Sequence, residues 1–207
     1  MSISFQVTWE SALSITGWLI GLIGVCVSIF YGRKSLRLER ERITLKWEDV
    51  EIAAEDLSKR ISDSGFKPSL ILTFGSKCGY LAHLISRSFS PSAPVVVGVT
   101  LPKGGRVAEP LASMLSFIET KRWCVGIPTQ LLDYGDQHVL IVDDWVLSGD
   151  AIEKMCDLLV QSGVPRKNIV SATLVATDTA VQNGKAPSYY WKTTSSTNFF
   201  FPWGRAR

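Results

Sequence analysis

VLIVDDWVLSGDA, residues Val139–Ala151, is the stretch that decides the fold. It opens with the apolar run Val139–Val142, which is typical of a strand buried on both faces of a parallel sheet. Two carboxylates, Asp143 and Asp144, follow, and a hydroxyl residue and a glycine precede a helical pattern. Ligands of open α/β sheets bind at the carboxyl ends of the strands, where helix N-termini bind phosphate and acids bind hydroxyls or Mg²⁺. The stretch therefore predicts a site for a phosphorylated sugar.

The rest of the chain extends this pattern to an α/β domain. Apolar runs predict strands over 70–74, 94–100, 121–128 (reaching toward the motif strand) and 169–176, and amphipathic patterns predict helices over 80–89 and 151–161. Residues 32–62 carry mixed charges at helical spacing and predict a helix leading into the domain, with a bend near 44–47. Strands that alternate with helices indicate a doubly wound parallel sheet.

Composition bounds the class of protein. The chain has 207 residues and a net charge of +3, so one domain with an appendage is expected and nucleic acid is not an expected partner. The cysteines are widely spaced and form no CxxC pair, which argues against a zinc site and fits reduced thiols in the cytosol. They are Cys26, Cys78, Cys124 and Cys156.

The N-terminal segment Ser11–Tyr31 contains no charged residue. About 20 apolar residues cross a bilayer as a helix, and the basic residues after the segment predict a cytoplasmic C-terminal domain. A cleaved signal peptide would instead carry basic residues before its apolar core. We therefore expect a single-pass membrane protein in which residues 11–31 contact lipid. The predicted divisions are an N-terminal segment with the transmembrane helix (1–32), a juxtamembrane helix or linker (33–46) and the main domain (47–207).

The stretch 139–151 resembles the diphosphate-sugar (PRPP) motif of type I phosphoribosyltransferases, which has four apolar residues, two acids, a short linker, a hydroxyl residue and Gly. The resemblance implies a parallel sheet flanked by helices, with a C-terminal hood. It implies that Asp143 and Asp144 contact the ribose hydroxyls and Mg²⁺. It also implies that the 5′-phosphate is bound by the next turn: Ser148, Gly149, Asp150 and Ala151.

Two further segments resemble parts of the same family. The strand, loop and helix over 70–89 resemble its pyrophosphate-binding unit, in which Ser76 and Lys77 would contact pyrophosphate. The loop 102–109 carries Lys103 and Arg106, which the resemblance assigns to closure over pyrophosphate during catalysis. Without the family context, this loop reads as a plain surface turn.

The tail 187–207, PSYYWKTTSSTNFFFPWGRAR, resembles the hood of the xanthine/guanine type of phosphoribosyltransferase. The residues before its Pro-Trp pair would contact the purine, and these are Asn198 and Phe199. Thr177 stands where that subgroup has a Lys that contacts the purine keto oxygen. The alternative is that the aromatic residues form a small hydrophobic lid on the sheet.

Asp150 departs from the family pattern. With Glu153 it fits a capping box in which Asp150 is the N-cap, and its carboxylate would then compete with a 5′-phosphate for the helix start. The alternative is that Asp150 points to solvent. Two functions stay open: a membrane-anchored, Mg²⁺-dependent and homo-oligomeric transferase that joins PRPP to a purine-like nucleobase, or an altered nucleotide- or PRPP-binding sensor or effector at the membrane. A structural membrane protein without a ligand is the third alternative.

Overall fold

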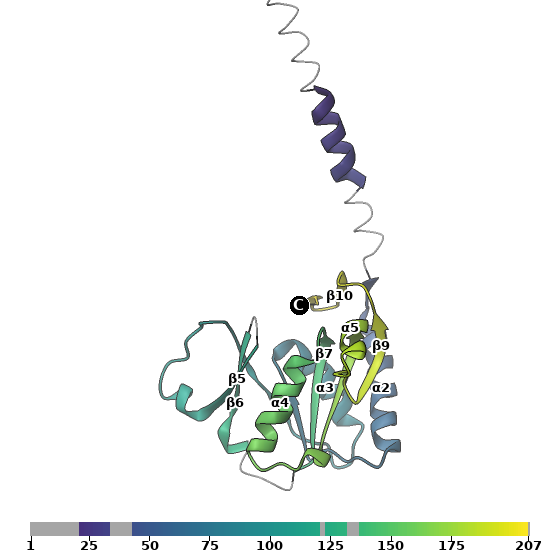
Figure 1. Cartoon of the computed structure of the whole chain (residues 1–207). Coiled ribbons are helices and arrows are strands. Elements are labelled where there is room, and N and C mark those ends of the chain that lie inside the picture. Colours follow the sequence, from purple (N-terminus) through teal and green to yellow (C-terminus); the bar gives the residue numbers. More distant parts are fainter. Residues whose placement is uncertain (1–20, 34–42, 121–122, 132–136, 207) are drawn as a thin grey trace, which may run out of the picture. The chain divides into compact units, whose positions relative to one another are not determined.

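The computed structural model describes residues 21–33, 43–120, 123–131 and 137–206 (Figure 1). The chain divides into two units, 1–42 and 43–207. In the first unit, residues 21–33 form an exposed helix. Among the described residues, no helix has both the length and the apolar character that spanning a membrane requires. The first half of the predicted transmembrane segment, 11–20, lies outside the described residues, as does 34–42 of the predicted juxtamembrane helix.

A parallel sheet lies at the centre of the second unit, as predicted. Its strand order is β3-β2-β7-β8-β9, so the motif strand β7 lies between two others (Figure 1). The strands are β2 (Leu70–Thr73), β3 (Val95–Val97), β7 (Val139–Val146), β8 (Ile169–Thr177) and β9 (Tyr189–Thr194). The central position explains why Val139–Val142 consists of apolar residues, since all four are buried.

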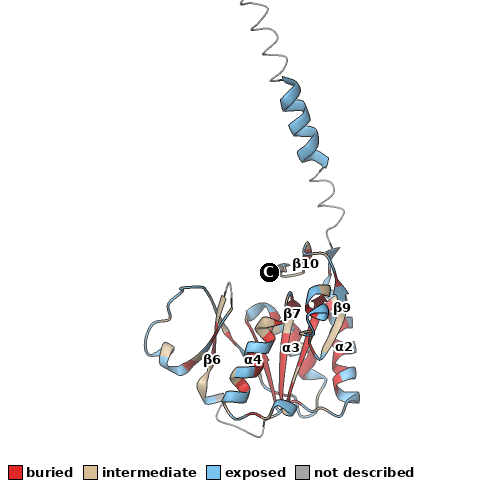
Figure 2. Cartoon of the chain, viewed as in Figure 1, coloured by how far each residue is buried: buried red, intermediate tan, exposed pale blue. Residues whose placement is uncertain are grey.

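Helices cover both faces of this sheet and create two hydrophobic cores (Figure 2). Alternate residues of β7 belong to the two cores. Leu140 and Val142 pack with α2 (Trp47–Asp63) and α3 (Ser76–Arg87). Val139 and Ile141 pack with α4 (Asp150–Gln161). A short helix, α5 (Asp178–Gln182), follows β8. This two-sided packing confirms the helix-flanked α/β architecture.

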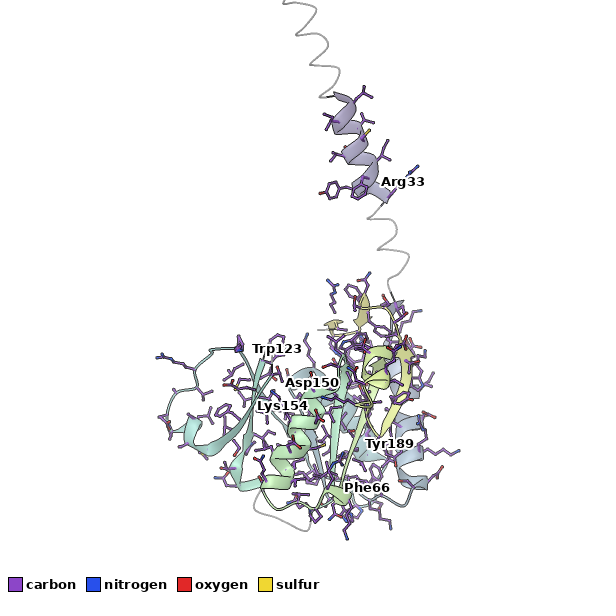
Figure 3. All side chains as sticks on the ribbon, in the orientation of Figure 1. Arg33, Phe66, Trp123, Asp150, Lys154 and Tyr189 are labelled. Atoms are coloured by element: carbon purple, nitrogen blue, oxygen red, sulfur yellow. The ribbon has the colours of Figure 1, made fainter. Side chains whose placement is uncertain are left out.

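A second, antiparallel sheet in the order β4-β6-β5 stands beside α4. Its strands are β4 (Val99–Pro102), β5 (Leu115–Glu119) and β6 (Trp123–Pro128). Short 3-10 turns precede β5 (Leu111–Met114), follow β6 (Thr129–Leu131) and precede β8 of the parallel sheet (Arg166–Asn168). The predicted strand 94–100 is split at Gly98, where a Cβ would lie 2.9 Å from the carbonyl oxygen of Thr73. Lys154 of α4 donates a hydrogen bond to the carbonyl of Glu119 in this sheet (Figure 3).

The C-terminal segment forms a third small sheet with the start of the unit. β10 (Phe199–Phe201) pairs with β1 (Ile43–Thr44) and with β11 (Gly204–Arg205). The predicted helix does not include residues 43–44, because their backbone pairs with β10, and α2 begins at Trp47, within the bend predicted near 44–47. Phe199 and Phe201 face the core, so this sheet fits the alternative of a hydrophobic lid.

Candidate functional site

The two acids of the motif lie inside β7 rather than after it. Asp143 is in register with Thr173 of β8, and the strand continues to Val146. Asp143 Oδ1 accepts hydrogen bonds from the Asp144 amide at 2.9 Å and from the Cys78 thiol at 3.2 Å. Both acids are half-buried, so their carboxylates are partly removed from water beside one another.

Burial and mutual repulsion govern the charge of this pair. Burial, followed by the neighbouring negative charge of Asp144, raises the pKa of Asp143 to about 7. Burial also raises the pKa of Asp144, although the Trp203 indole N–H and the charge of Lys77 act in the opposite direction. Near neutral pH, the pair therefore shares a proton unless a cation or a donor compensates for its charge.

The start of α3 contributes the residues next to the acid pair. The predicted loop 75–79 is shorter than expected, because the helix begins at Ser76, directly after an extended Gly75. Lys77 lies in this first turn, and its positive charge acts on Asp144. Cys78 is buried and donates a hydrogen bond to Asp143, a contact that the sequence analysis did not predict. The structure therefore brings the predicted pyrophosphate segment and the two acids together.

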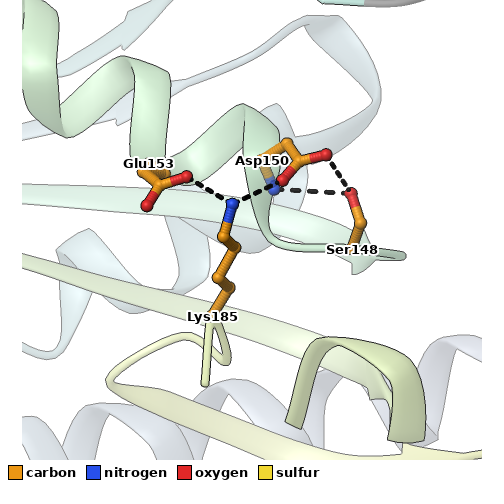
Figure 4. A network of polar contacts seen from close by, with 4 residues as sticks. All are labelled: Ser148, Asp150, Glu153 and Lys185. Atoms are coloured by element: carbon orange, nitrogen blue, oxygen red, sulfur yellow. Dashed lines mark hydrogen bonds and ion pairs between the residues drawn. The ribbon is translucent and has the colours of Figure 1, made fainter. Parts of the chain in front are cut away.

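The turn after β7 contains a network of polar contacts (Figure 4). Gly149, with φ +82°, precedes α4, and Asp150 is the first helical residue. The predicted capping box is wrong, because Gly149 is the N-cap and the Asp150 carboxylate accepts from Ser148 Oγ at 3.0 Å. Lys185 Nζ forms ion pairs with Asp150 Oδ1 at 2.8 Å and Glu153 Oε2 at 2.6 Å.

Lys185 is a residue of this turn that sequence reasoning missed. It reaches the turn from the segment after α5, 35 positions beyond Asp150, and no local pattern connects the two. Hydrogen bonds that Lys185 donates to Asp150 and Glu153 raise its pKa, so its ammonium stays charged. A phosphate at this turn would lie near that ammonium and near the first-turn amides of α4, which have no hydrogen-bond partner within the helix. It would also lie near the carboxylates of Asp150 and Glu153.

We expect Gly149→Ala to destabilise this turn more than Gly163→Ala does at the end of α4. Both glycines have positive φ, but a Cβ at Gly149 would lie 2.2 Å from the carbonyl oxygen of Lys185, whereas nothing lies within 4 Å of one at Gly163. The Gly163 variant carries only the backbone cost of about 1 kcal/mol, and the Gly149 variant adds a clash worth about 1–3 kcal/mol. Urea unfolding of both variants measures the difference, and equal losses would contradict the close approach of Lys185.

Thr177 and Asn198, both predicted to contact a base, form hydrogen bonds with backbone groups. Thr177 ends β8, is buried, accepts from the Ala180 amide at 3.2 Å as the N-cap of α5, and donates to the carbonyl of Leu147. The carbonyl of Asn198 accepts from the Ile43 amide at 3.1 Å. To contact a base, the Thr177 hydroxyl would therefore have to break its capping hydrogen bond at the start of α5.

Phe199, the third predicted base residue, is 2% exposed and packs in the core against Trp145 and Phe201. A base could stack on Phe199 only if the ring left this core. The aromatic residue that does reach the acids is Trp203, whose Nε1 donates to Asp144 Oδ2 at 2.6 Å. The Pro-Trp pair was the sequence signal that could have predicted this contact, because a buried indole N–H usually donates a hydrogen bond to an acceptor.

The predicted loop residues follow the first strand of the second sheet. Lys103 and Arg106 are exposed in the turn that follows β4. The catalytic roles that the resemblance assigns to Lys103 and Arg106 stay predictions.

The family is decided by comparison of the whole domain with known proteins. A family model described as "Phosphoribosyl transferase domain" matches residues 43–206. The chain belongs to the phosphoribosyltransferase family. This match covers the parallel sheet, both acids, the turn before α4 and the C-terminal segment, and it agrees with the resemblance of the PRPP motif. No curated protein matches the chain by sequence.

Solved structures of two phosphoribosyltransferases and of one hypothetical protein share the fold of this chain. A purine phosphoribosyltransferase from Pyrococcus horikoshii is 21% identical with a TM-score of 0.55, over 81% of this chain and 97% of that one. A xanthine-guanine-hypoxanthine phosphoribosyltransferase from Helicobacter pylori is 16% identical with a TM-score of 0.52, over 79% and 93%. A hypothetical protein from Neisseria gonorrhoeae with bound ppGpp is 16% identical with a TM-score of 0.56, over 78% and 88%. At these identities, the likeness establishes the fold.

Proposed function

We propose that this phosphoribosyltransferase transfers the phosphoribosyl group of PRPP to a purine-like nucleobase and releases pyrophosphate. The observation that carries the proposal is the contact of Asp143 and Asp144 with the first turn of α3, on the strand that leads directly into the turn Ser148–Ala151. These are groups suited to ribose hydroxyls, pyrophosphate and a 5′-phosphate respectively. The purine preference is supported by the family match together with the purine phosphoribosyltransferases that share the fold.

The acid pair fits a divalent cation. Cys78, Asp143 and Asp144 each offer a ligand atom, and these atoms lie within 4.8 Å of one another. Mg²⁺ prefers oxygen and is usually bound by one or two carboxylates together with substrate phosphates, so the two Asp residues would hold it and the thiol would not. When bound, Mg²⁺ would neutralise charge on the departing pyrophosphate.

The protein's own contribution to transfer is to position charge around the sugar. Asp144 and Asp143 accept hydrogen bonds from the ribose hydroxyls, which orients the anomeric carbon and offsets its developing positive charge. Lys77, in the first turn of α3, attracts the pyrophosphate as it departs. Ser148 and the first amides of α4 hold the 5′-phosphate, so the sugar is bound at both ends while the bond to pyrophosphate breaks.

The test is pyrophosphate release by the full chain with PRPP, Mg²⁺ and each nucleobase in turn. We expect release only when PRPP and a purine are both present, and none after chelation of the metal. PRPP binding without release in the presence of any base would contradict transferase activity.

The Lys185 network favours a second candidate, a PRPP- or nucleotide-binding sensor without turnover. The two carboxylates paired with Lys185 occupy the turn where a 5′-phosphate would bind, and a protein of the same fold holds ppGpp. Saturable binding of a guanine nucleotide, with no pyrophosphate released from PRPP and any base, would favour this candidate over the enzyme.

We propose as well that residues 11–31 anchor the chain in a membrane with the main domain on the cytoplasmic side. The support is the uncharged segment followed by Arg33 and Lys34. Flotation with lipid vesicles tests the anchor: the full chain should float, and a variant with Ile23→Arg and Val25→Arg should not. Flotation of both would contradict anchoring through this segment.

A further inference from the structure

The C-terminal segment is bonded to the acid pair through one side chain. Trp203 Nε1 donates a hydrogen bond to Asp144 Oδ2 at 2.6 Å. Asp144 belongs to β7 and Trp203 to the turn between β10 and β11, 59 positions later in the chain. The contact therefore joins the predicted ribose site to the lid.

The indole ring is held in place from two sides. It stacks on Phe201, with ring centroids 5.3 Å apart and an interplanar angle of 6°. Its centroid also lies 5.7 Å from the ring centroid of Trp47, the first residue of α2. Phe201 is itself a core residue, 3% exposed. Because the ring is supported by the core and by α2, its N–H is presented to Asp144 in a fixed direction.

The bond leaves Asp144 able to bind a ligand. A carboxylate accepts about four hydrogen bonds, so the indole N–H on Oδ2 restricts the group and still leaves acceptor capacity for a ligand. The charge of Lys77 acts on the same carboxylate from α3. A carboxylate whose orientation is set before the sugar arrives loses less freedom on binding, which strengthens binding.

We propose that Trp203 is a positioning residue for the ribose site, which holds the Asp144 carboxylate in its binding orientation and couples the lid to PRPP binding. This inference rests on the proposed function, since it requires a ribose site at Asp144. Trp203 acts through Asp144, and the proposal assigns it no contact with the reacting atoms.

The experiment is calorimetric titration of PRPP, in the presence of Mg²⁺, into the full chain in detergent. The wild type is compared with Trp203→Phe, which keeps an aromatic ring and removes the N–H donor. The matched control is Trp191→Phe, the same substitution on β9, where the indole lies beneath the Lys192 ammonium. We expect the Trp203 variant to bind PRPP about tenfold more weakly, the scale of one hydrogen bond to a charged group, and the Trp191 variant to bind it as the wild type does.

A second measurement reads the contact directly in the wild type. The Trp203 indole N–H resonance of the ¹⁵N-labelled chain, assigned by its loss in Trp203→Phe or by its displacement in Asp144→Asn, should shift when PRPP saturates the site. Equal PRPP affinity of the wild type and Trp203→Phe, or a resonance that PRPP does not move, overturns this inference alone. A wild-type chain that does not bind PRPP overturns the proposed function together with it. If Trp203→Phe does not fold, the resonance in the wild type still decides.

Discussion

Replacing Asp144 with Asn is expected to lower kcat/KM for PRPP-dependent pyrophosphate release by about a hundredfold or more, the cost of removing one preorganised electrostatic contact. The amide keeps the shape of the carboxylate but removes the charge that a ribose hydroxyl and Mg²⁺ require. Folding should not suffer, because burial and the neighbouring acid already disfavour the second charge in the pair. The measurement is steady-state kinetics of pyrophosphate release beside urea unfolding of the same variant.

The control is Asp157→Asn on the exposed side of α4. It removes the same charge from the same domain at a position away from the acid pair, so activity should stay at the wild-type level. Full activity of Asp144→Asn with unchanged stability would contradict the role of the acid pair. Equal losses of activity in Asp144→Asn and Asp157→Asn would show that activity falls with any change of net charge.

The second large effect is on stability. In the absence of metal, the free energy of unfolding should fall as the pH rises from about 4 to 7. The pKa of Asp143 is raised from 3.8 to about 7 in the folded chain. In this window, the folded state therefore keeps a proton that the unfolded chain has released, and stability decreases with pH. A difference of roughly three pKa units corresponds to up to about 4 kcal/mol, at 1.36 kcal/mol per unit.

Urea unfolding at pH 5 and pH 8 in the presence of a chelator measures this effect. Asp143→Asn has no proton to lose at this position, so its stability should change less over the window and exceed that of the wild type at pH 8. Saturating Mg²⁺ should reduce the dependence of the wild type, because the cation stabilises the ionised pair. The same slope in the wild type and in Asp143→Asn would locate the titration elsewhere.

Much of the fold could be predicted because it depends on patterns within short segments. The run Val139–Val142 reads as a doubly buried strand, and the structure places it between β2 and β8. The spacing of Ile152, Met155, Leu158 and Leu159 predicts one apolar face of α4, and all but the partly buried Leu158 are buried there. The predicted end of the helix over 151–161 is confirmed, since α4 ends at Gln161.

Where predictions failed, a contact from elsewhere in the chain competed with the local pattern. Ile43 and Thr44 fit a helix by spacing but pair with β10. Gly98 splits an apolar run because the backbone of β2 lies against it. Asp150 fits an N-cap, but Lys185 and Ser148 bind its carboxylate.

The sequence by itself therefore determined the parallel sheet, the acid pair and the order of the segments around it, because burial and periodicity are local properties of the chain. Only the tertiary structure decided that Cys78 and Trp203 bind the two acids and that Lys185 closes onto the turn before α4. Those partners are separated from their targets by 35 to 65 positions. Which donor reaches a buried carboxylate across such a separation depends on how the strands pair and how the lid packs, and no local pattern records it.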